Sequence, residues 1–166
     1  MSVNSWTLIV YLSDTKVGSP NPSHPGNQRG ANDGVIHLIQ HHYKVPAANF
    51  TLDRDGTVYV HAANPVWRSG VGTFTGKTPW HGLGIPADMG NRWMLGVKII
   101  SKGVKPDFTA AQKESLVLLA LACQRAAQWP SVKTRRLPRH RDWTQRKPDI
   151  LYANSTVQKW ITTCRP

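Results

Sequence analysis

The sequence predicts an α/β domain with a mixed central β-sheet flanked by helices. Short β-prone runs are spread along the chain, apolar residues at helical spacing occur between them, and two of the runs are joined by a hairpin-type turn. Because strands and helices alternate, helices are expected on the faces of the sheet. The chain has 166 residues, enough for one core, so residues 1–166 are interpreted as a single domain.

The N-terminal part is expected to contain one strand, one long loop and one helix. The strand covers Trp6–Leu12, a short apolar run rich in residues that favour strands. Ser13–Ala31 contains three Pro and three Gly among polar residues, which indicates a long loop, and long loops are often functional. Asn32 or Asp33 can cap the helix, which should end near Lys44.

The middle of the chain predicts a β-hairpin and a further strand. Two β-prone runs, Asn49–Asp53 and Thr57–His61, are joined by Arg54-Asp55-Gly56, and Asp-Gly is preferred in tight hairpin turns. Residues 62–91 are rich in Gly, Pro and Trp, which indicates an irregular segment. Strand character returns at Trp93–Ile100.

One long helix is predicted in the C-terminal part. Thr109-Ala110-Ala111-Gln112 has the pattern of a capping box, and apolar residues at helical spacing continue to about residue 128. Leu118 and its neighbours make this helix apolar on most sides, so it should be central.

Two shorter elements should follow the long helix. A strand near Lys133–Leu137 would deliver His140 to an edge of the sheet, and Asn154 or Ser155 would cap a short helix that contains Trp160. Four residues are expected in the core because of their apolar surroundings: Cys123, Trp6, Trp93 and Trp129.

The charge balance predicts an anionic partner. The chain has 21 Lys and Arg against 9 Asp and Glu, a formal net charge of +12, which favours a cell-wall polymer, a nucleic acid or an acidic protein. No recognised nucleic-acid-binding motif is present, which argues against nucleic acid. Lys133–Lys147 holds seven basic residues and one acid, and is either a solvated loop or a docking stripe with Trp143 as its stacking surface.

His140 and Asp149 are nine residues apart, and Lys147 lies two residues before the aspartate. Imidazole and carboxylate groups are both good zinc ligands, and an ammonium group nearby can stabilise a developing oxyanion. The same spacing also fits a hydrogen-bonded pair within a loop. Spacing alone leaves both interpretations open.

Four segments share their pattern with a known family: the hairpin Phe50–Val60, the run Gly84–Asn91 leading into Leu95-Gly96-Val97, the helix opening Phe108–Gln112, and His140–Asp149. Together they cover most of residues 5 to 150, in the right order. The set resembles the zinc-dependent N-acetylmuramoyl-L-alanine amidases, whose fold is shared with peptidoglycan-recognition proteins and phage endolysins. The resemblance implies that fold, a zinc cofactor and peptidoglycan as partner.

The resemblance also implies roles for individual residues. In such enzymes one zinc ligand is a histidine at the end of the first strand, and the other two are a histidine and an Asp or Cys in the final loop. His140 and Asp149 match the last two, and Lys147 matches a lysine that polarises the scissile carbonyl. The first ligand has no matching histidine, and depending on register its position falls on Tyr11, Ser13 or the carboxylate of Asp14.

Further departures from the family pattern lie near the expected pocket. Arg68 stands where phage enzymes of this type usually carry a histidine, and Lys98 stands where they carry a glutamate. Ala48 replaces a tyrosine often found in the second strand. Cations at Arg68 and Lys98 would oppose a divalent metal. With Trp67 and Trp80 in the pocket-side segment, they form a candidate binding surface for sugars or proteins.

Neither a signal peptide nor a membrane span is expected. Met1–Leu12 has no basic region before its apolar run, and no apolar run of about eighteen residues occurs in the chain. Together with the resemblance, this predicts a chain made in the host cytoplasm that acts on the cell wall or within a phage particle.

Three functional hypotheses result. The favoured one is a phage-type amidase-like protein that has lost most hydrolytic activity. It acts as a peptidoglycan-binding protein or as a virion structural or interaction protein, with peptidoglycan, another anionic cell-wall polymer or phage structural proteins as partners. The first alternative is an active endolysin-type amidase in which Asp14, His140 and Asp149 hold zinc and Lys147 stabilises the oxyanion. The second is a basic, partner-binding regulator or assembly protein. Zinc is expected only if the site is functional.

Overall fold

The structure, a computed structural model, describes the backbone of residues 7–13 and residues 48–64, 66, 69–76, 84–101, 107–126, 137–144, 146, 156, 159 and 160, without the side chain of residue 124. The helix predicted from Asn32 to Lys44 lies outside these residues, as do Trp6 and Trp129 and all but the last residue of the strand predicted near Lys133–Leu137.

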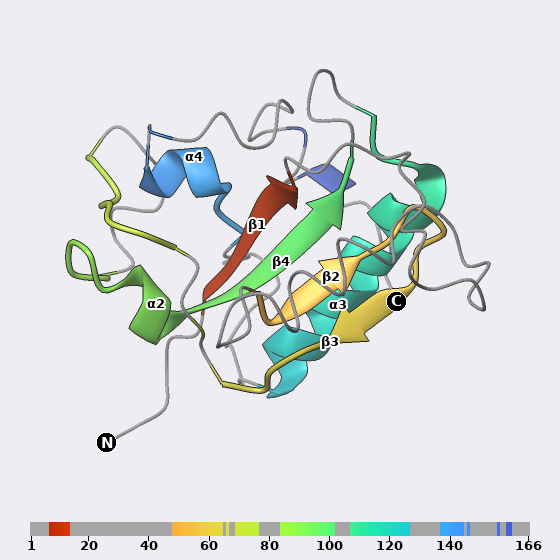
Figure 1. Ribbon diagram of the computed structural model, residues 1–166, viewed down its shortest axis with the longest axis horizontal. Helices are drawn as coiled ribbons and strands as arrows, with labels where there is room; N and C mark the ends of the chain where they lie inside the picture. The colour runs from red at the N-terminus through yellow and green to blue at the C-terminus, as the bar shows by residue number, and fades with distance from the viewer. Residues whose placement is uncertain are drawn as a thin grey trace, which may run out of the picture.

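The described strands form one mixed sheet (Figure 1). Its strands are β1 (Thr7–Ser13), β2 (Phe50–Leu52), β3 (Val58–Val60) and β4 (Met94–Ile100), in the spatial order β1-β4-β2-β3. β4 runs parallel to β1 on one side and to β2 on the other, and β3 is antiparallel to β2. The predicted mixed sheet is confirmed, and its four described strands lie where strands were predicted; the strand predicted near Lys133–Leu137 stays a prediction.

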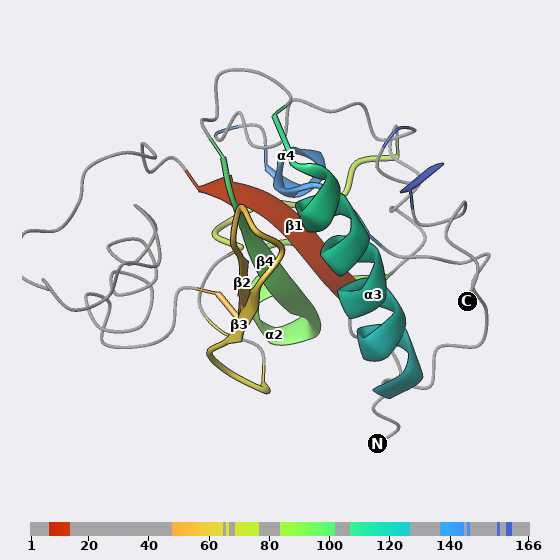
Figure 2. The same ribbon diagram turned by 90° about the vertical axis from the view of Figure 1, so that its right-hand side faces the viewer.

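The sheet is accompanied by α2 (Gly90–Trp93), α3 (Ala110–Ala126) and α4 (His140–Trp143). Residues 156, 159 and 160 are also helical, as expected for the short helix predicted to contain Trp160. α3 packs across one face of the sheet (Figure 2), whereas α4 contacts the edge strand β1. The short α2 leads directly into β4. None of the described helices has the length and apolar character that a membrane span requires.

The hairpin turn forms as its sequence predicts. Gly56 has φ +90°, a conformation that side chains disfavour, and its N–H donates to the carbonyl of Asp53 at 3.1 Å. A Cβ at Gly56 would lie 2.9 Å from Oγ of Ser115 on α3. Glycine is therefore needed both for the turn and for the close approach of α3.

The predicted capping box of α3 is confirmed and ties the helix to the sheet. Thr109 Oγ1 accepts from the Gln112 N–H at 3.0 Å, and Gln112 Oε1 accepts from the Thr109 N–H at 3.1 Å. Gln112 is fully buried, and its Nε2 donates to the carbonyl of Ile100 at 2.8 Å. One side chain thus joins the start of α3 to the end of β4.

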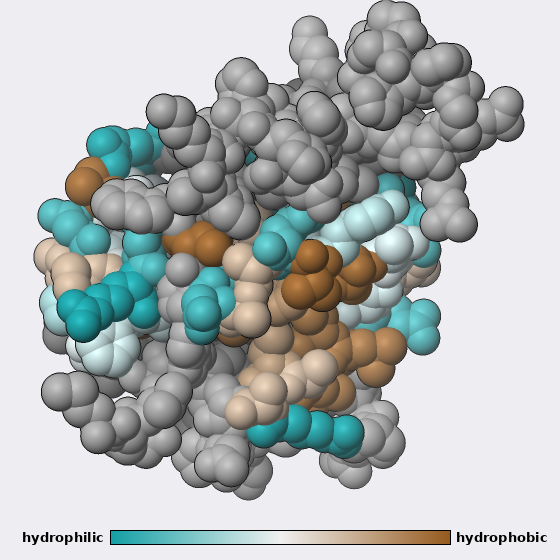
Figure 3. All heavy atoms as spheres, turned by 60° about the horizontal axis from the view of Figure 1, so that its bottom comes forward, coloured by the Kyte–Doolittle hydropathy of each residue, from teal (hydrophilic) through white to brown (hydrophobic). Residues whose placement is uncertain are grey.

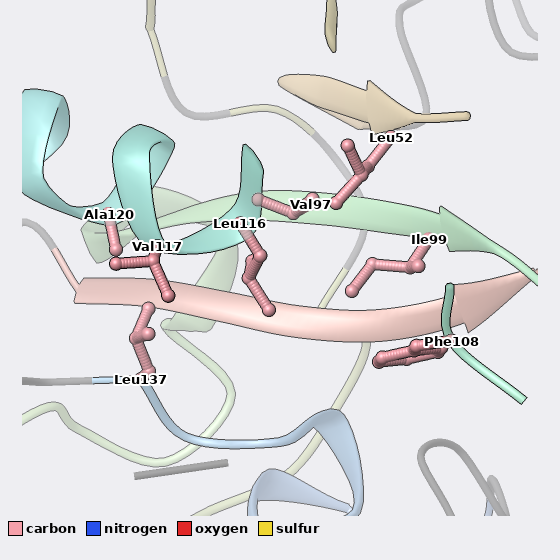
Figure 4. Close-up of a cluster of buried hydrophobic side chains, with 8 residues drawn as sticks. All are labelled: Leu52, Val97, Ile99, Phe108, Leu116, Val117, Ala120 and Leu137. Carbon is pink, nitrogen blue, oxygen red and sulfur yellow. The ribbon is translucent and has the colours of Figure 1, made fainter. Parts of the chain in front are cut away.

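The core lies between α3 and the sheet (Figure 4). Its cluster combines residues of β2, β4 and α3 with two residues outside regular elements: Leu52, Val97, Ile99, Leu116, Val117, Ala120, Phe108 and Leu137. Cys123 is buried as predicted, and burial raises its pKa to about 11. Burying these side chains against one another is the main favourable term for this layer.

Two predictions about burial are wrong. The long helix was expected to be central because its residues are apolar on most sides. It is not enclosed on all sides, because Leu118 is 60% exposed on the face turned away from the sheet. Trp93 was expected in the core but is 40% exposed. It is the last residue of α2, and the position that enters the core is that of the next residue, Met94, which is fully buried. Apolar and polar side chains also lie side by side on the surface seen in Figure 3.

Candidate functional site

The face of the sheet opposite α3 carries polar residues at the centre of the ladder. Val97 and Ile99 of β4 belong to the core under α3, so Lys98 between them lies on the opposite face. In the ladder Lys98 pairs with Tyr11 of β1 and with Thr51 of β2. The three positions therefore form one row across the parallel strands.

Thr51 of this row forms a partly buried hydrogen-bonded pair with His61. Thr51 is fully buried, and its Oγ1 lies 2.8 Å from Nε2 of His61. Burial lowers the pKa of His61 below its ordinary value. His61 Nδ1 is buried and has no hydrogen-bond partner within the described residues. The sequence reasoning missed His61, although its place directly after the second hairpin strand could have indicated it.

His140 lies at the first position of α4, next to the edge strand. Its side chain is 6% exposed, and its Nε2 is 3.1 Å from the backbone carbonyl oxygen of Ser69. A carbonyl oxygen only accepts, so Nε2 carries the proton, and a neutral imidazole then has its lone pair on Nδ1. Metal-binding histidines are typically held in this way by a carbonyl at the other ring nitrogen.

The start of α4 is held by a short-range pair. Asp142 Oδ2 accepts from the backbone N–H of Arg139 at 3.0 Å and from its Nε at 3.1 Å. The two side chains also form an ion pair. The one acid of the basic segment is therefore engaged with one of its arginines, and this pair fixes the position from which His140 projects.

Trp143 does not form the stacking surface that the sequence predicted. Its ring is 2% exposed, Nε1 donates to the carbonyl of Gly70 at 3.3 Å, and Phe74 packs edge-on at 5.1 Å between ring centroids. A Cβ at Gly72 would lie 2.7 Å from the indole Cδ1. The large apolar ring gains more from burial against these neighbours than from exposure, since its N–H finds a partner inside.

The structure describes only part of the predicted site. Lys98 and His140 are described, Lys98 half-buried and His140 buried. Six further predicted residues lie outside the described part and stay predictions: Asp14, Trp67, Arg68, Trp80, Lys147 and Asp149. Tyr11 and Ser13 lie in β1, paired with Lys98 and Ile100.

Zinc can be tested against the donors that are described. His140 fits, because its hydrogen bond leaves the lone pair that a ligand needs on Nδ1. Lys98 does not fit, since an ammonium donates no lone pair and opposes a divalent cation. Within the described ranges, no three His, Cys, Asp or Glu side chains come together in an arrangement that could hold a metal ion.

Comparison with known proteins identifies the class. A family model described as N-acetylmuramoyl-L-alanine amidase matches residues 10–150. This chain belongs to that family of amidase hydrolases, whose members are typically zinc-dependent and act on peptidoglycan. No curated protein matches the chain in a sequence search. The predicted family is therefore confirmed.

Solved structures support the same fold. The amidase AmiD from E. coli, in complex with anhydro-N-acetylmuramic acid-L-Ala-D-gamma-Glu-L-Lys, has a TM-score of 0.65 at 12% identity; the match covers 94% of this chain and 57% of AmiD. The amidase LysC from Clostridium intestinale has a TM-score of 0.55 at 14% identity, over 98% of this chain and 89% of LysC.

Peptidoglycan recognition proteins are similar as well. The ectodomain complex of LCa and LCx bound to tracheal cytotoxin has a TM-score of 0.57 at 18% identity, over 95% of this chain and 83% of the matched one. Both amidases and recognition proteins thus share the predicted fold. The chain spans little more than half the length of AmiD.

Proposed function

We propose that this protein binds peptidoglycan through the face of the sheet opposite α3 and has lost most of the family's hydrolytic activity. The observation that carries the proposal is the pairing of Tyr11 with Lys98 in the parallel ladder. Lys98 is a lysine where the family pattern calls for a glutamate, and Tyr11 on the neighbouring strand is one of the positions on which the missing first-strand histidine can fall. An ammonium at Lys98 favours an anionic ligand over a cation.

The charge of the whole chain supports the same partner. A formal net charge of +12 attracts anionic polymers over long range and raises their rate of association. Lys98 lies on the central strand β4, so a carboxylate of a cell-wall peptide could reach it near the middle of this face. The fragment in the AmiD complex contains a D-gamma-Glu residue, which is an example of a cell-wall peptide residue that carries a carboxylate.

The test combines metal analysis, binding and hydrolysis on untagged protein. We expect no stoichiometric zinc by elemental mass spectrometry, co-sedimentation with purified sacculi, and no release of peptide with or without added zinc. Lys98→Gln, which keeps length but removes charge, should weaken sacculus binding. Robust zinc-dependent release of peptide by the wild-type protein would contradict the proposal. Loss of all binding at high salt would reduce it to non-specific attraction.

A gain-of-function variant sharpens this test. Tyr11→His combined with Lys98→Glu replaces the two departures on neighbouring strands, and should increase the zinc bound per chain. Lys98→Glu alone is the matched control, because it removes the cation without adding a histidine. If neither variant binds more zinc than the wild type, the two positions do not explain the loss.

A second candidate is an active zinc amidase, and the hydrogen bond of His140 favours it. The hydrogen bond to the Ser69 carbonyl orients the ring and favours the tautomer with its lone pair on Nδ1, as a carbonyl partner does for many metal-binding histidines. Asp149 and Asp14 would complete the ligand set, and Lys147 would stabilise the oxyanion. In that case Asp149→Ala should abolish both bound zinc and peptide release, whereas Asp149→His should retain part of the metal.

A further inference from the structure

A chain of hydrogen bonds connects α2 with His140 through one loop residue. The side-chain oxygen Oδ1 of Asn91, on α2, accepts from the backbone N–H of Ser69 at 2.6 Å. The backbone carbonyl of Ser69 in turn accepts from Nε2 of His140 at 3.1 Å. Ser69 is 1% exposed, so both of its backbone groups are engaged away from solvent.

The loop that contains Ser69 is held on both sides. Gly72 exchanges two hydrogen bonds with Asp88, its N–H donating to Oδ1 at 2.7 Å and its carbonyl accepting from the Asp88 N–H at 2.8 Å. On the other side, the Trp143 carbonyl accepts from the N–H of Thr73 at 2.9 Å, and the indole donates to Gly70. These bonds hold Gly70, Gly72 and Thr73, which follow Ser69, whereas the N–H of Ser69 itself is held by Asn91.

Close packing places the start of α2 directly against Ser69. A Cβ at Gly90 would lie 2.8 Å from Cβ of Ser69 and 3.0 Å from Cε2 of Trp143. Gly90 immediately precedes Asn91, so the first turn of α2 presses against Ser69 while its second residue accepts the Ser69 N–H.

We infer that Asn91 is a positioning residue that sets the tautomer of His140 through the backbone of Ser69. Oδ1 of Asn91 holds Ser69 in place through the Ser69 N–H. The carbonyl of Ser69 requires a proton on Nε2 of His140, so the lone pair of the neutral imidazole lies on Nδ1. This effect of Asn91 concerns the tautomer of His140 alone. The inference therefore goes beyond the proposed function and does not depend on whether the protein hydrolyses peptidoglycan.

The direct test measures the ring nitrogens of His140 by nitrogen-15 NMR in metal-free protein near neutral pH. A His140→Gln spectrum assigns the signals. The wild type should show a protonated Nε2 and an unprotonated Nδ1. In Asn91→Ala, which removes the acceptor, this preference should decrease and the two ring signals should move toward averaged positions. A wild-type ring protonated on Nδ1 alone would overturn the inference without any variant.

Two controls separate positioning from a merely structural effect. Asn91→Asp keeps an oxygen acceptor for the Ser69 N–H and should restore the wild-type pattern. Ser69→Ala keeps the backbone carbonyl and removes a hydroxyl that is buried without a hydrogen-bond partner in the described chain, so it should leave the pattern unchanged. A folded Asn91→Ala protein with the wild-type tautomer would contradict the inference.

Zinc affinity provides an independent test. If the wild-type protein or the Tyr11→His, Lys98→Glu variant binds zinc, adding Asn91→Ala should weaken that affinity by about 10- to 100-fold, because a group that orients the metal-binding histidine is lost. If no zinc binds, the proposed loss of the centre stands and the NMR result alone decides the role of Asn91.

Discussion

The two faces of the central sheet share the same strands but differ in chemistry. Toward α3, Val97, Ile99 and Leu52 are fully buried in an apolar cluster. On the other face, Met94 and Ile100 of β4 are buried and apolar, but Lys98 between them and Thr51 of β2 are polar, and Thr51 is hydrogen-bonded to His61. The face toward α3 holds the layers together, whereas Lys98 and Thr51 lie outside that cluster. The family's fold can therefore persist while the chemistry of the polar face changes.

The largest effect should come from the apolar face. Leu116→Ala removes a fully buried side chain from the α3 cluster and should lower the free energy of unfolding by about 2–5 kcal/mol. Leu118→Ala on the same helix is the matched control, because Leu118 is 60% exposed and the change should be small. Urea denaturation measures both. Equal effects of the two substitutions would remove the distinction between the faces of α3.

A smaller loss should follow from Gln112→Ala at the start of α3. This change removes the capping-box acceptor and the buried donor to the Ile100 carbonyl, and unpaired buried groups cost about 1–3 kcal/mol. Glu114→Ala, an exposed position in the same helix, serves as control. An unchanged unfolding midpoint for Gln112→Ala would show that the sheet and α3 do not depend on this contact.

On the polar face, stability should depend on pH through His61. Burial lowers its pKa below the ordinary 6.5, so below that value the unfolded chain binds the proton more readily than the folded one. The stability contributed by the neutral ring is complete above 6.5 and is lost as pH falls from there toward the lowered pKa. Unfolding at several pH values should show a shallower decline for His61→Gln than for the wild type. Parallel curves would rule out this origin.

The smallest effect on stability is expected at Lys98. Because Lys98 is half-buried and outside the apolar cluster, Lys98→Gln should change the free energy of unfolding by less than about 1 kcal/mol. Sacculus binding should nevertheless weaken, and its dependence on salt should decrease. A large loss of stability with unchanged binding would reverse the roles assigned to the two faces.

Local features of this protein were predictable from the sequence. Two such features are the capping box of Thr109 and Gln112 and the turn at Gly56. Each forms between residues at most a few positions apart, so a short sequence pattern was enough to predict it. The strand character of Trp93–Ile100 predicted β4, and the helical spacing of apolar residues predicted α3. The segments that resemble the amidases predicted the family, which the family match confirms.

Only the tertiary structure decided the environment of individual site residues. The hydrogen bond of His140 joins residues 71 positions apart. The pairing of Tyr11 with Lys98 joins two strands that are separated in the sequence by the whole β2–β3 hairpin and the segments on both sides of it. Trp143 lies in a basic segment, yet the loop of Gly70 and Gly72 packs closely enough to bury it. The burial of Trp143 and the ring tautomer of His140 depend on which distant segments pack together. A short-range sequence pattern contains no information about that packing.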